Sequence, residues 1–151
     1  WWFRGAHRRL TVFLLTTGLV GGLVDTLVKV AVDRERPSLV HPIATAHGKS
    51  FPSGHTMLAT YGYGALLLTF LPLLPRRLHR PAIGAWLATV ALIAFSRLGL
   101  GVHYISDVLG GFVLGLAWLV AMTAAFSIWR VERGRPAVEP TEGLEPEVAR
   151  D

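Results

Sequence analysis

Residues 104–129 read YISDVLGGFVLGLAWLVAMTAAFSIW, and this stretch decides the fold. Asp107 is its one charged residue, and it lies close to the start. A helix needs about 20 predominantly apolar residues to cross the hydrocarbon core of a bilayer. The stretch therefore predicts a transmembrane helix with a carboxylate in its first turn.

Three further stretches are long and apolar enough for the same role, at residues 10–32, 57–74 and 81–95, the last of which can extend to Leu100. Of the 151 residues, 52% are hydrophobic and 17% are charged, a balance unusual for a soluble domain. We expect an all-α integral membrane bundle with four transmembrane helices over residues 1–130. Residues 131–151, rich in Pro, Glu, Gly and Arg, are expected to form a disordered cytoplasmic tail.

The distribution of basic residues predicts the orientation. Those on one side of the spans are Arg4, Arg8, Arg9, Arg76, Arg77, Arg80, Arg130, Arg133 and Arg135. The positive-inside rule places this side in the cytoplasm, with both ends of the segment, and Trp1, Trp2 and Trp129 fall near the same boundary. The net charge of +5 comes from residues that border apolar runs, so nucleic acid is not an expected partner. The chain has no cysteine, which excludes disulfides and thiolate metal sites.

Three polar clusters lie on the opposite, outer side of the predicted bundle. They are Lys29-x6-Arg36-Pro37, Pro52-Ser53-Gly54-His55 and Ser96-Arg97-x5-His103-x3-Asp107. Charge at a membrane boundary is costly and commonly marks function. Together the clusters supply three cations, two imidazoles and a carboxylate, which suits the handling of a phosphate group.

The second cluster precedes an apolar span and resembles a helix start. Ser53 is a favoured N-cap residue, and Gly54 lets an anion approach the backbone. The first N–H groups of such a helix have no internal partner and bind phosphate readily. The alternative is an ordinary capped helix start at which His55 is incidental.

His103 and Asp107 are four residues apart, so on a helix they share one face. The carboxylate can accept the Nδ1–H of the imidazole and leave Nε2 free as a nucleophile or base. The alternative is a polar pair on the surface of the helix near the membrane boundary.

Lys29, Arg36 and Arg97 can surround a transferring phosphoryl group if they converge, although each alone can be a cation that reaches toward lipid headgroups. Asp25, four residues before Lys29, is expected to pair with it and support the site from behind. The remaining polar residues near the boundaries are expected to be solvated: Arg34, Lys49, His7, His41, His47 and His79.

A metal centre is the rival interpretation of the same residues. His55, His103 and Asp107 would supply two imidazoles and one carboxylate. Three nearby cations would repel a divalent ion but attract an oxyanion. We therefore expect no metal.

The three clusters, in this order and spacing, resemble the signature of the type 2 phosphatidic acid phosphatase (PAP2) superfamily of membrane phosphatases, with every specified position present. The resemblance implies a six-helix core, of which this chain would be the C-terminal four helices, and the first residue, Trp1, is consistent with a missing upstream part. It implies that His103 forms a phosphohistidine, that Asp107 orients it, and that His55 protonates the leaving oxygen. It further implies that Lys29, Arg36, Ser53, Gly54 and Arg97 bind the phosphate, without a cofactor.

The expected function is therefore hydrolysis of a lipid phosphomonoester or diphosphate, such as a polyprenyl diphosphate, at the outer face of a bacterial cell membrane. Transfer of the phosphoryl group to another lipid or sugar is a related alternative. A non-catalytic phospholipid-binding or transport module is an alternative of a different class. The four apolar spans argue against a soluble vanadate haloperoxidase, whose site chemistry is similar.

Overall fold

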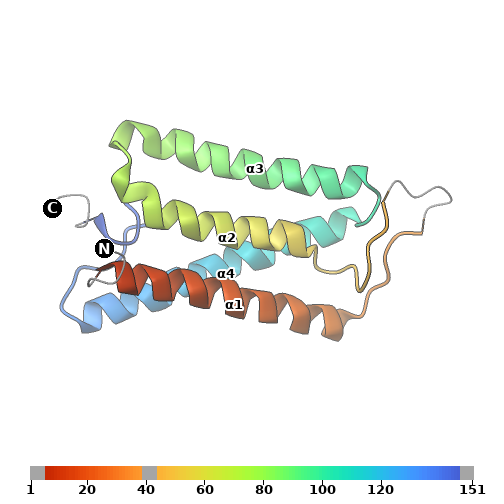
Figure 1. Cartoon of the computed structure of the whole chain (residues 1–151), viewed down its shortest axis with the longest axis horizontal. Helices are drawn as coiled ribbons and strands as arrows, with labels where there is room; N and C mark the ends of the chain where they lie inside the picture. The colour runs from red at the N-terminus through yellow and green to blue at the C-terminus, as the bar shows by residue number, and fades with distance from the viewer. Residues whose placement is uncertain (1–5, 39–43, 147–151) are drawn as a thin grey trace.

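The computed structural model describes residues 6–38 and 44–146, and within these ranges the chain forms four long helices (Figure 1). Helix α1 spans Ala6–Val32, α2 Gly54–Phe70, α3 His79–Gly99 and α4 Ile105–Glu132. Two short 3-10 helices, η1 at Leu71–Leu73 and η2 at Arg76–Leu78, connect α2 to α3. Each long helix is long and apolar enough to cross a membrane, so the four predicted spans and the all-α class are confirmed.

Helix α2 is the centre of the bundle and contacts α1, α3 and α4 (Figure 1). Phe13 on α1 and Phe126 on α4 pack edge to face, with ring centroids 5.4 Å apart. Met57 and Tyr61 on α2 join them in the core, together with Leu119 on α4. The hydrophobic core therefore runs along α2, and the helices are not buried on all sides.

Glycines allow α4 to approach the start of α2 very closely. A Cβ added to Gly111 would lie 2.6 Å from the carbonyl oxygen of Ser53, and one on Gly115 would lie 2.8 Å from that of Met57. Any larger residue at either position would push the helices apart. Gly111 and Gly115 therefore form a close helix contact, whereas no described atom lies within 4 Å of a Cβ built on Gly18 or Gly22.

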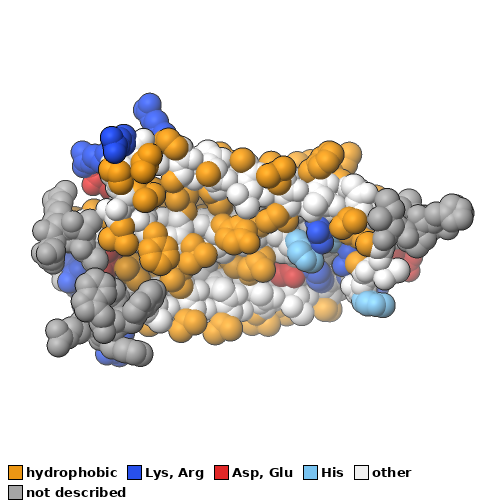
Figure 2. Space-filling model, turned by 45° about the horizontal axis from the view of Figure 1, so that its top comes forward, with side chains coloured by type: hydrophobic (Ala, Val, Ile, Leu, Met, Phe, Trp, Pro, Cys, Tyr) orange, Lys and Arg blue, Asp and Glu red, His pale blue; other side chains and the backbone are white. Residues whose placement is uncertain are grey.

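On the face that Figure 2 shows, hydrophobic side chains line the length of the helices, and the charged side chains gather toward the two ends. Large side chains that face outward include Leu19, Leu92 and Phe95. Such a surface is costly in water but suits the hydrocarbon of a bilayer. The distribution agrees with helices that are solvated by lipid along their length.

The segment after α4 differs from the disordered tail that composition suggested. Residues 133–146 fold back across the end of the bundle, and Leu144 is fully buried in the core. The Leu144 N–H donates to the carbonyl oxygen of Leu68 at 3.0 Å, a helix carbonyl whose ordinary partner would be the N–H that Pro72 lacks. Gly143 has φ +88°, and a Cβ there would lie 2.5 Å from the Pro72 ring.

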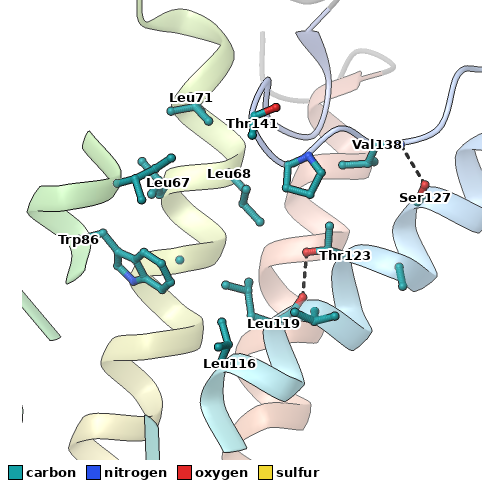
Figure 3. Close-up of a pocket in the computed structure, with 15 residues that line it drawn as sticks. Leu67, Leu68, Leu71, Trp86, Leu116, Leu119, Thr123, Ser127, Val138 and Thr141 are labelled. Carbon is teal, nitrogen blue, oxygen red and sulfur yellow. Dashed lines mark hydrogen bonds between the residues drawn. The ribbon is translucent and has the colours of Figure 1, made fainter. Parts of the chain in front are cut away.

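A buried carboxylate fastens this segment. Glu145 has no exposed side-chain surface, and its Oε1 accepts from Arg9 Nε at 2.7 Å, with Arg130 and Arg135 each at 3.8 Å. The Val138 N–H donates to Ser127 Oγ at 2.9 Å, which lays the segment over an apolar cavity of about 440 Å³ (Figure 3). A few specific contacts therefore order a stretch of polar composition.

Some predictions concern residues outside the described part of the chain. Trp1, Trp2, Arg4, His41 and the last five residues, 147–151, lie there. Lys49 pairs with Asp33 at 2.6 Å on a largely exposed surface, as expected of a solvated charge.

Replacing Glu145 tests whether the C-terminal segment is fastened as described. Glu145→Ala leaves Arg9 and Arg130 without their buried partner, so we expect a loss of about 3–5 kcal/mol in the free energy of unfolding. Thermal unfolding in detergent measures it as a lower Tm. The matched control is Glu142→Ala, whose partner Arg76 is exposed and whose effect should stay within about 1 kcal/mol. Equal Tm values for both variants would mean that the segment is not held by Glu145.

Candidate active site

Residues from all three predicted clusters meet at the end of the bundle where α1 ends and α2 and α4 begin. There they surround a cavity of about 330 Å³. The residues that line it are Gly22, Asp25, Lys29, Arg36, Gly54, His55, Leu58, Tyr61 and His103. The convergence expected from sequence is thus found for two cations, the α2 start and both histidines. We call this the anion cavity.

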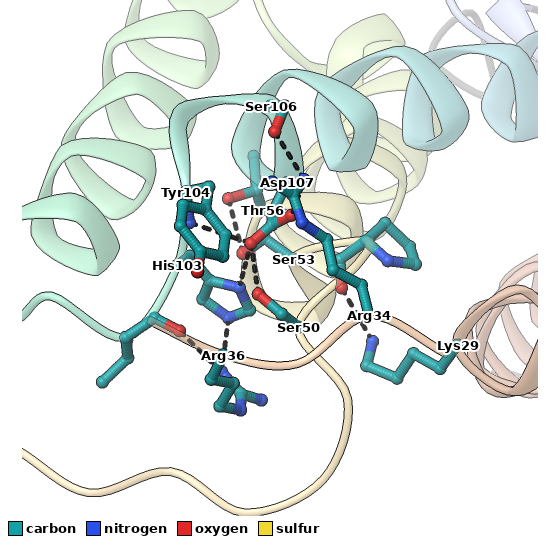
Figure 4. A network of polar contacts seen from close by, with 12 residues as sticks. Lys29, Arg34, Arg36, Ser50, Ser53, Thr56, His103, Tyr104, Ser106 and Asp107 are labelled. Atoms are coloured by element: carbon teal, nitrogen blue, oxygen red, sulfur yellow. Dashed lines mark hydrogen bonds and ion pairs between the residues drawn. The ribbon is translucent and has the colours of Figure 1, made fainter. Parts of the chain in front are cut away.

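His103 lies in the turn before α4 and not on the helix itself, which begins at Ile105. Its Nε2 accepts a hydrogen bond from Arg36 Nη1 at 3.1 Å, and its Nδ1 faces Asp107 Oδ2 at 3.4 Å (Figure 4). Because a guanidinium can only donate, Nε2 must carry the lone pair and Nδ1 the proton. The ring therefore has the tautomer that a nucleophilic histidine needs. His103 reaches Asp107 from the turn before α4, and not from one face of a shared helix as the sequence spacing suggested.

The surroundings of His103 keep its imidazole neutral. Burial and then the neighbouring Arg36 guanidinium lower the pKa of His103 below its ordinary value of 6.5, and Asp107 opposes them only in part. A neutral ring at neutral pH has the Nε2 lone pair available for reaction.

Asp107 is fully buried and binds three separate parts of the chain (Figure 4). Its Oδ2 accepts the Tyr104 N–H at 2.8 Å, and the Ser50 hydroxyl donates to the same oxygen. Its Oδ1 accepts from Arg34 Nη1 at 3.0 Å. These bonds fix the carboxylate that faces His103.

Arg34 and Ser50 are two residues that hold the site together and that sequence reasoning missed. Arg34 was expected to be a solvated loop charge, but it donates to Asp107 and to Ser106 Oγ at 2.6 Å, and it lies over the Tyr104 ring. One signal was available, because residues two apart in extended chain point to the same side, and Arg34 is two before Arg36. Nothing in the sequence distinguishes Ser50 from other loop serines.

The two cations in the anion cavity are held by protein oxygen atoms. Arg36 donates from Nε to the Gly48 carbonyl at 3.0 Å and from Nη1 to the Val102 carbonyl at 2.9 Å. Lys29 Nζ donates to the Pro52 carbonyl at 3.0 Å and pairs with Asp25 at 2.5 Å, so the predicted Asp25–Lys29 contact is present. Both positive groups are therefore held in place by the protein itself.

The start of α2 presents Gly54 and His55 to the cavity, whereas Ser53 is fully buried behind them. Ser53 occupies the N-cap position but makes no capping side-chain bond, and its hydroxyl accepts from Thr56 Oγ1 at 3.1 Å. A Cβ on Gly54 would lie 3.1 Å from both Asp25 Oδ2 and Lys29 Nζ. The missing side chain is what allows α1 and the α2 terminus to approach.

Arg97 does not line the anion cavity. It lines a neighbouring cavity of about 370 Å³ between α2 and α3, which shares His55 and Leu58 with the first. Its Nε donates to Ser96 Oγ at 3.1 Å. The three predicted cations are therefore divided, two on one side of His55 and one on the other.

The rival metal interpretation has no matching ligand set in the described residues. In residues 6–38 and 44–146, no three His, Asp or Glu side chains come together as ligands. The described site instead offers two fixed cations, the unpaired N–H groups of a helix start and an imidazole with an available lone pair. This arrangement can bind a tetrahedral oxyanion and attack it.

Several known proteins are similar to this chain in sequence. Residues 9–130 match the model of the PAP2 superfamily. Phosphatidylglycerophosphatase B of Bacillus subtilis (strain 168) is 39% identical over 97 residues, which cover 62% of this chain and 47% of the relative. Lipid A 1-phosphatase of Rhizobium etli is 33% identical over 121 residues, covering 74% and 48%. Undecaprenyl-diphosphatase BcrC of B. subtilis is 32% identical over 114 residues, covering 72% and 54%.

A solved structure is similar over most of this chain. It is the crystal structure of a transmembrane PAP2 type phosphatidylglycerolphosphate phosphatase from B. subtilis, with a TM-score of 0.63 and 31% identity. The likeness covers 74% of this chain and 56% of that one, and this chain spans about half the length of the curated relatives it matches. The resemblance seen in the three clusters is confirmed: this integral membrane chain belongs to the PAP2 superfamily.

Proposed function

We propose that this chain forms the catalytic part of a membrane phosphatase that hydrolyses a lipid phosphomonoester or diphosphate through a phosphohistidine at His103. The observation that carries the proposal is the arrangement around that ring. Its Nε2 lone pair lies at the edge of a cavity that also holds Lys29, Arg36 and His55. Its Nδ1 faces the buried carboxylate of Asp107.

In the first step, Nε2 of His103 attacks phosphorus, and the bond from phosphorus to the lipid oxygen breaks. Protonated His55, on the α2 terminus, gives its proton to that leaving oxygen. The products are a lipid alcohol and a phosphohistidine, or a lipid monophosphate and a phosphohistidine when the substrate is a diphosphate. Asp107 stabilises the positive charge that spreads over the His103 ring.

In the second step, neutral His55 takes a proton from water, and the resulting hydroxide attacks the phosphohistidine. The phosphorus–nitrogen bond breaks, inorganic phosphate leaves, and His103 regains its lone pair. Each proton that His55 gives in the first step returns in the second. The cycle is therefore balanced with water as the one added reactant, and it has no step that needs a metal ion.

Lys29, Arg36 and the Gly54 backbone hold the nonbridging oxygens of the phosphoryl group. Arg36 exchanges its contact with His103 for a contact with phosphate oxygen, which frees Nε2 for attack. Arg97 approaches from the other side of His55. Ser53 acts from behind by fixing the α2 terminus against α4, since its N–H donates to the Asp107 carbonyl at 2.9 Å.

Three observations support a lipid as the substrate and the outer face as the location. The cavity lies at the end of an apolar bundle, where lipid headgroups meet water. The named relatives are phosphatases of phosphatidylglycerophosphate, lipid A and undecaprenyl diphosphate. The opposite end carries Arg76, Arg77 and Arg80, and by the positive-inside rule it faces the cytoplasm of a bacterial cell. We also propose that the four helices are the last four of the six-helix core that the resemblance implies; the solved relative is covered to 56%, so it is longer than this chain.

The nucleophile is tested by replacing His103. His103→Asn in the full-length, detergent-solubilised protein should lower phosphate release from lipid phosphates by roughly 10⁴-fold, because an amide cannot form the phosphoenzyme. Acid-quenched protein should carry phosphate on histidine in the parent and none in the variant. His79→Ala, at the opposite end of the bundle, is the matched control and should retain activity. Turnover that persists in His103→Asn would rule out this mechanism.

The pH dependence follows from the surroundings of His103. Because its pKa lies below 6.5, the acid limb of kcat/KM, where the nucleophile becomes protonated, should have its midpoint below that value. The alkaline limb should report loss of the proton from His55. Arg36→Gln removes a cation that lowers the His103 pKa, so the acid limb should move to higher pH in addition to the loss of rate. An acid limb that stays in place would contradict the assignment of this limb to His103.

A further inference from the structure

The neighbouring cavity between α2 and α3 has a polar end and an apolar length. Its residues are His55, Leu58, Ala59, Gly62, Tyr63, Leu66, Ile93 and Arg97. We call it the α2–α3 groove. It is continuous with the anion cavity, because His55 and Leu58 line both.

The apolar part of the groove runs along the bundle away from the site. Leu58, Gly62 and Leu66 are spaced four apart on one face of α2. They span about 12 Å of helix at 1.5 Å per residue. Gly62 has no side chain to fill the groove, and a Cβ there would meet just Leu58, at 3.4 Å. The groove therefore leads from His55 toward the middle of the bilayer.

The other side of the anion cavity is closed toward the bilayer centre. Tyr61 is almost fully buried between α1 and α2. A Cβ on Gly21 would lie 2.7 Å from the Tyr61 ring and 2.8 Å from Trp118 Nε1, so α1 packs tightly against α2 at this level. Space beneath the site is present on the α3 side, where the α2–α3 groove has a volume of about 370 Å³.

We infer that the hydrocarbon chain of the lipid phosphate lies in the α2–α3 groove while its phosphate occupies the anion cavity. This inference rests on the proposed function and adds the path of the lipid's hydrocarbon chain. Arg97 stands at the mouth of the groove beside His55, where the ester or anhydride oxygen that joins chain to phosphate would lie. The two parts of the substrate meet at His55, the group that protonates that oxygen.

A lipid fits this groove better than another protein helix. A helix packed over it would bury His55 and the Arg97 guanidinium, for which Ser96 Oγ is the side-chain partner that the structure gives. A helix surface at this depth brings few acceptors, so the charge would lack compensation. A lipid phosphate brings oxygen atoms to the polar end and methylene groups to the apolar length.

The groove orients the substrate and adds little to its affinity. The chain is already dissolved in lipid, which is as apolar as leucine side chains, so moving it into the groove gains packing but no hydrophobic free energy. Its value lies in holding the phosphate against His103. Blocking the groove should therefore affect long-chain substrates and spare those too short to reach the block.

The test fills the groove at Gly62. In the full-length protein in mixed micelles, Gly62→Leu should lower kcat/KM for dihexadecanoyl phosphatidic acid by about tenfold or more, with dibutanoyl phosphatidic acid unaffected. Gly84→Leu adds the same volume on the exposed surface of α3, where no described side chain lies within 4 Å of a Cβ, and should leave both rates unchanged. Leu66→Trp blocks the far end alone, so it should impair the hexadecanoyl substrate and spare the dioctanoyl one.

The outcomes separate this inference from the proposed function. If the parent releases phosphate neither from these lipids nor from a polyprenyl diphosphate, the proposed function fails. If the parent is active and Gly62→Leu has the same rate on the long-chain substrate, the hydrocarbon chain does not lie in the α2–α3 groove. A loss that is equal for short and long chains, with the Tm unchanged, would also overturn it, because the block would then act on the phosphate site.

Discussion

The buried carboxylate of Asp107 is the constraint on which the site depends. A charge without exposed surface is tolerated in a protein when donors surround it, and here the donors come from the α1–α2 connection and from the turn before α4. Arg34 and Ser50 are 57 or more residues distant from it in sequence. Satisfying one carboxylate therefore brings together the segments that carry Arg36 and His103. The pocket is a consequence of this bond network as much as of helix packing.

Helix packing is the second constraint that positions the site. Gly111 and Gly115 let the α4 backbone approach the first turns of α2. As a result, the N–H of Ser53, before the start of α2, donates directly to the Asp107 carbonyl. In lipid, contacts of this kind are a main source of helix association, because no water is released. The position of His55 thus depends on the absence of two side chains on another helix.

Sequence reasoning recovered the helices and most of the site, for different reasons. The spans follow from apolar length, which the bilayer thickness fixes without reference to tertiary contacts. The convergence of Lys29, Arg36, His55 and His103 followed from the clusters sharing one membrane face. What failed depends on individual partners. Ser53 is buried because its N–H donates to the Asp107 carbonyl on α4. The segment at residues 133–146 is ordered by Leu144 and Glu145, two residues that average composition does not single out.

The three cations differ in how they are held, and this suggests a division of labour. Arg36 and Lys29 donate to protein carbonyls, and Lys29 also faces Asp25, so the protein itself fixes and partly balances the positive charge of the anion cavity. In the proposed mechanism Lys29 stays in place, and Arg36 gives up its contact with His103 while it keeps its bond to the Gly48 carbonyl. Such placement favours the stabilisation of a transition state. Arg97 has the hydroxyl of its neighbour Ser96 as its side-chain hydrogen-bond partner in the described residues. In the proposed mechanism, a cation beside His55 suits the leaving oxygen, whereas cations held by backbone carbonyls suit the phosphoryl oxygens that stay.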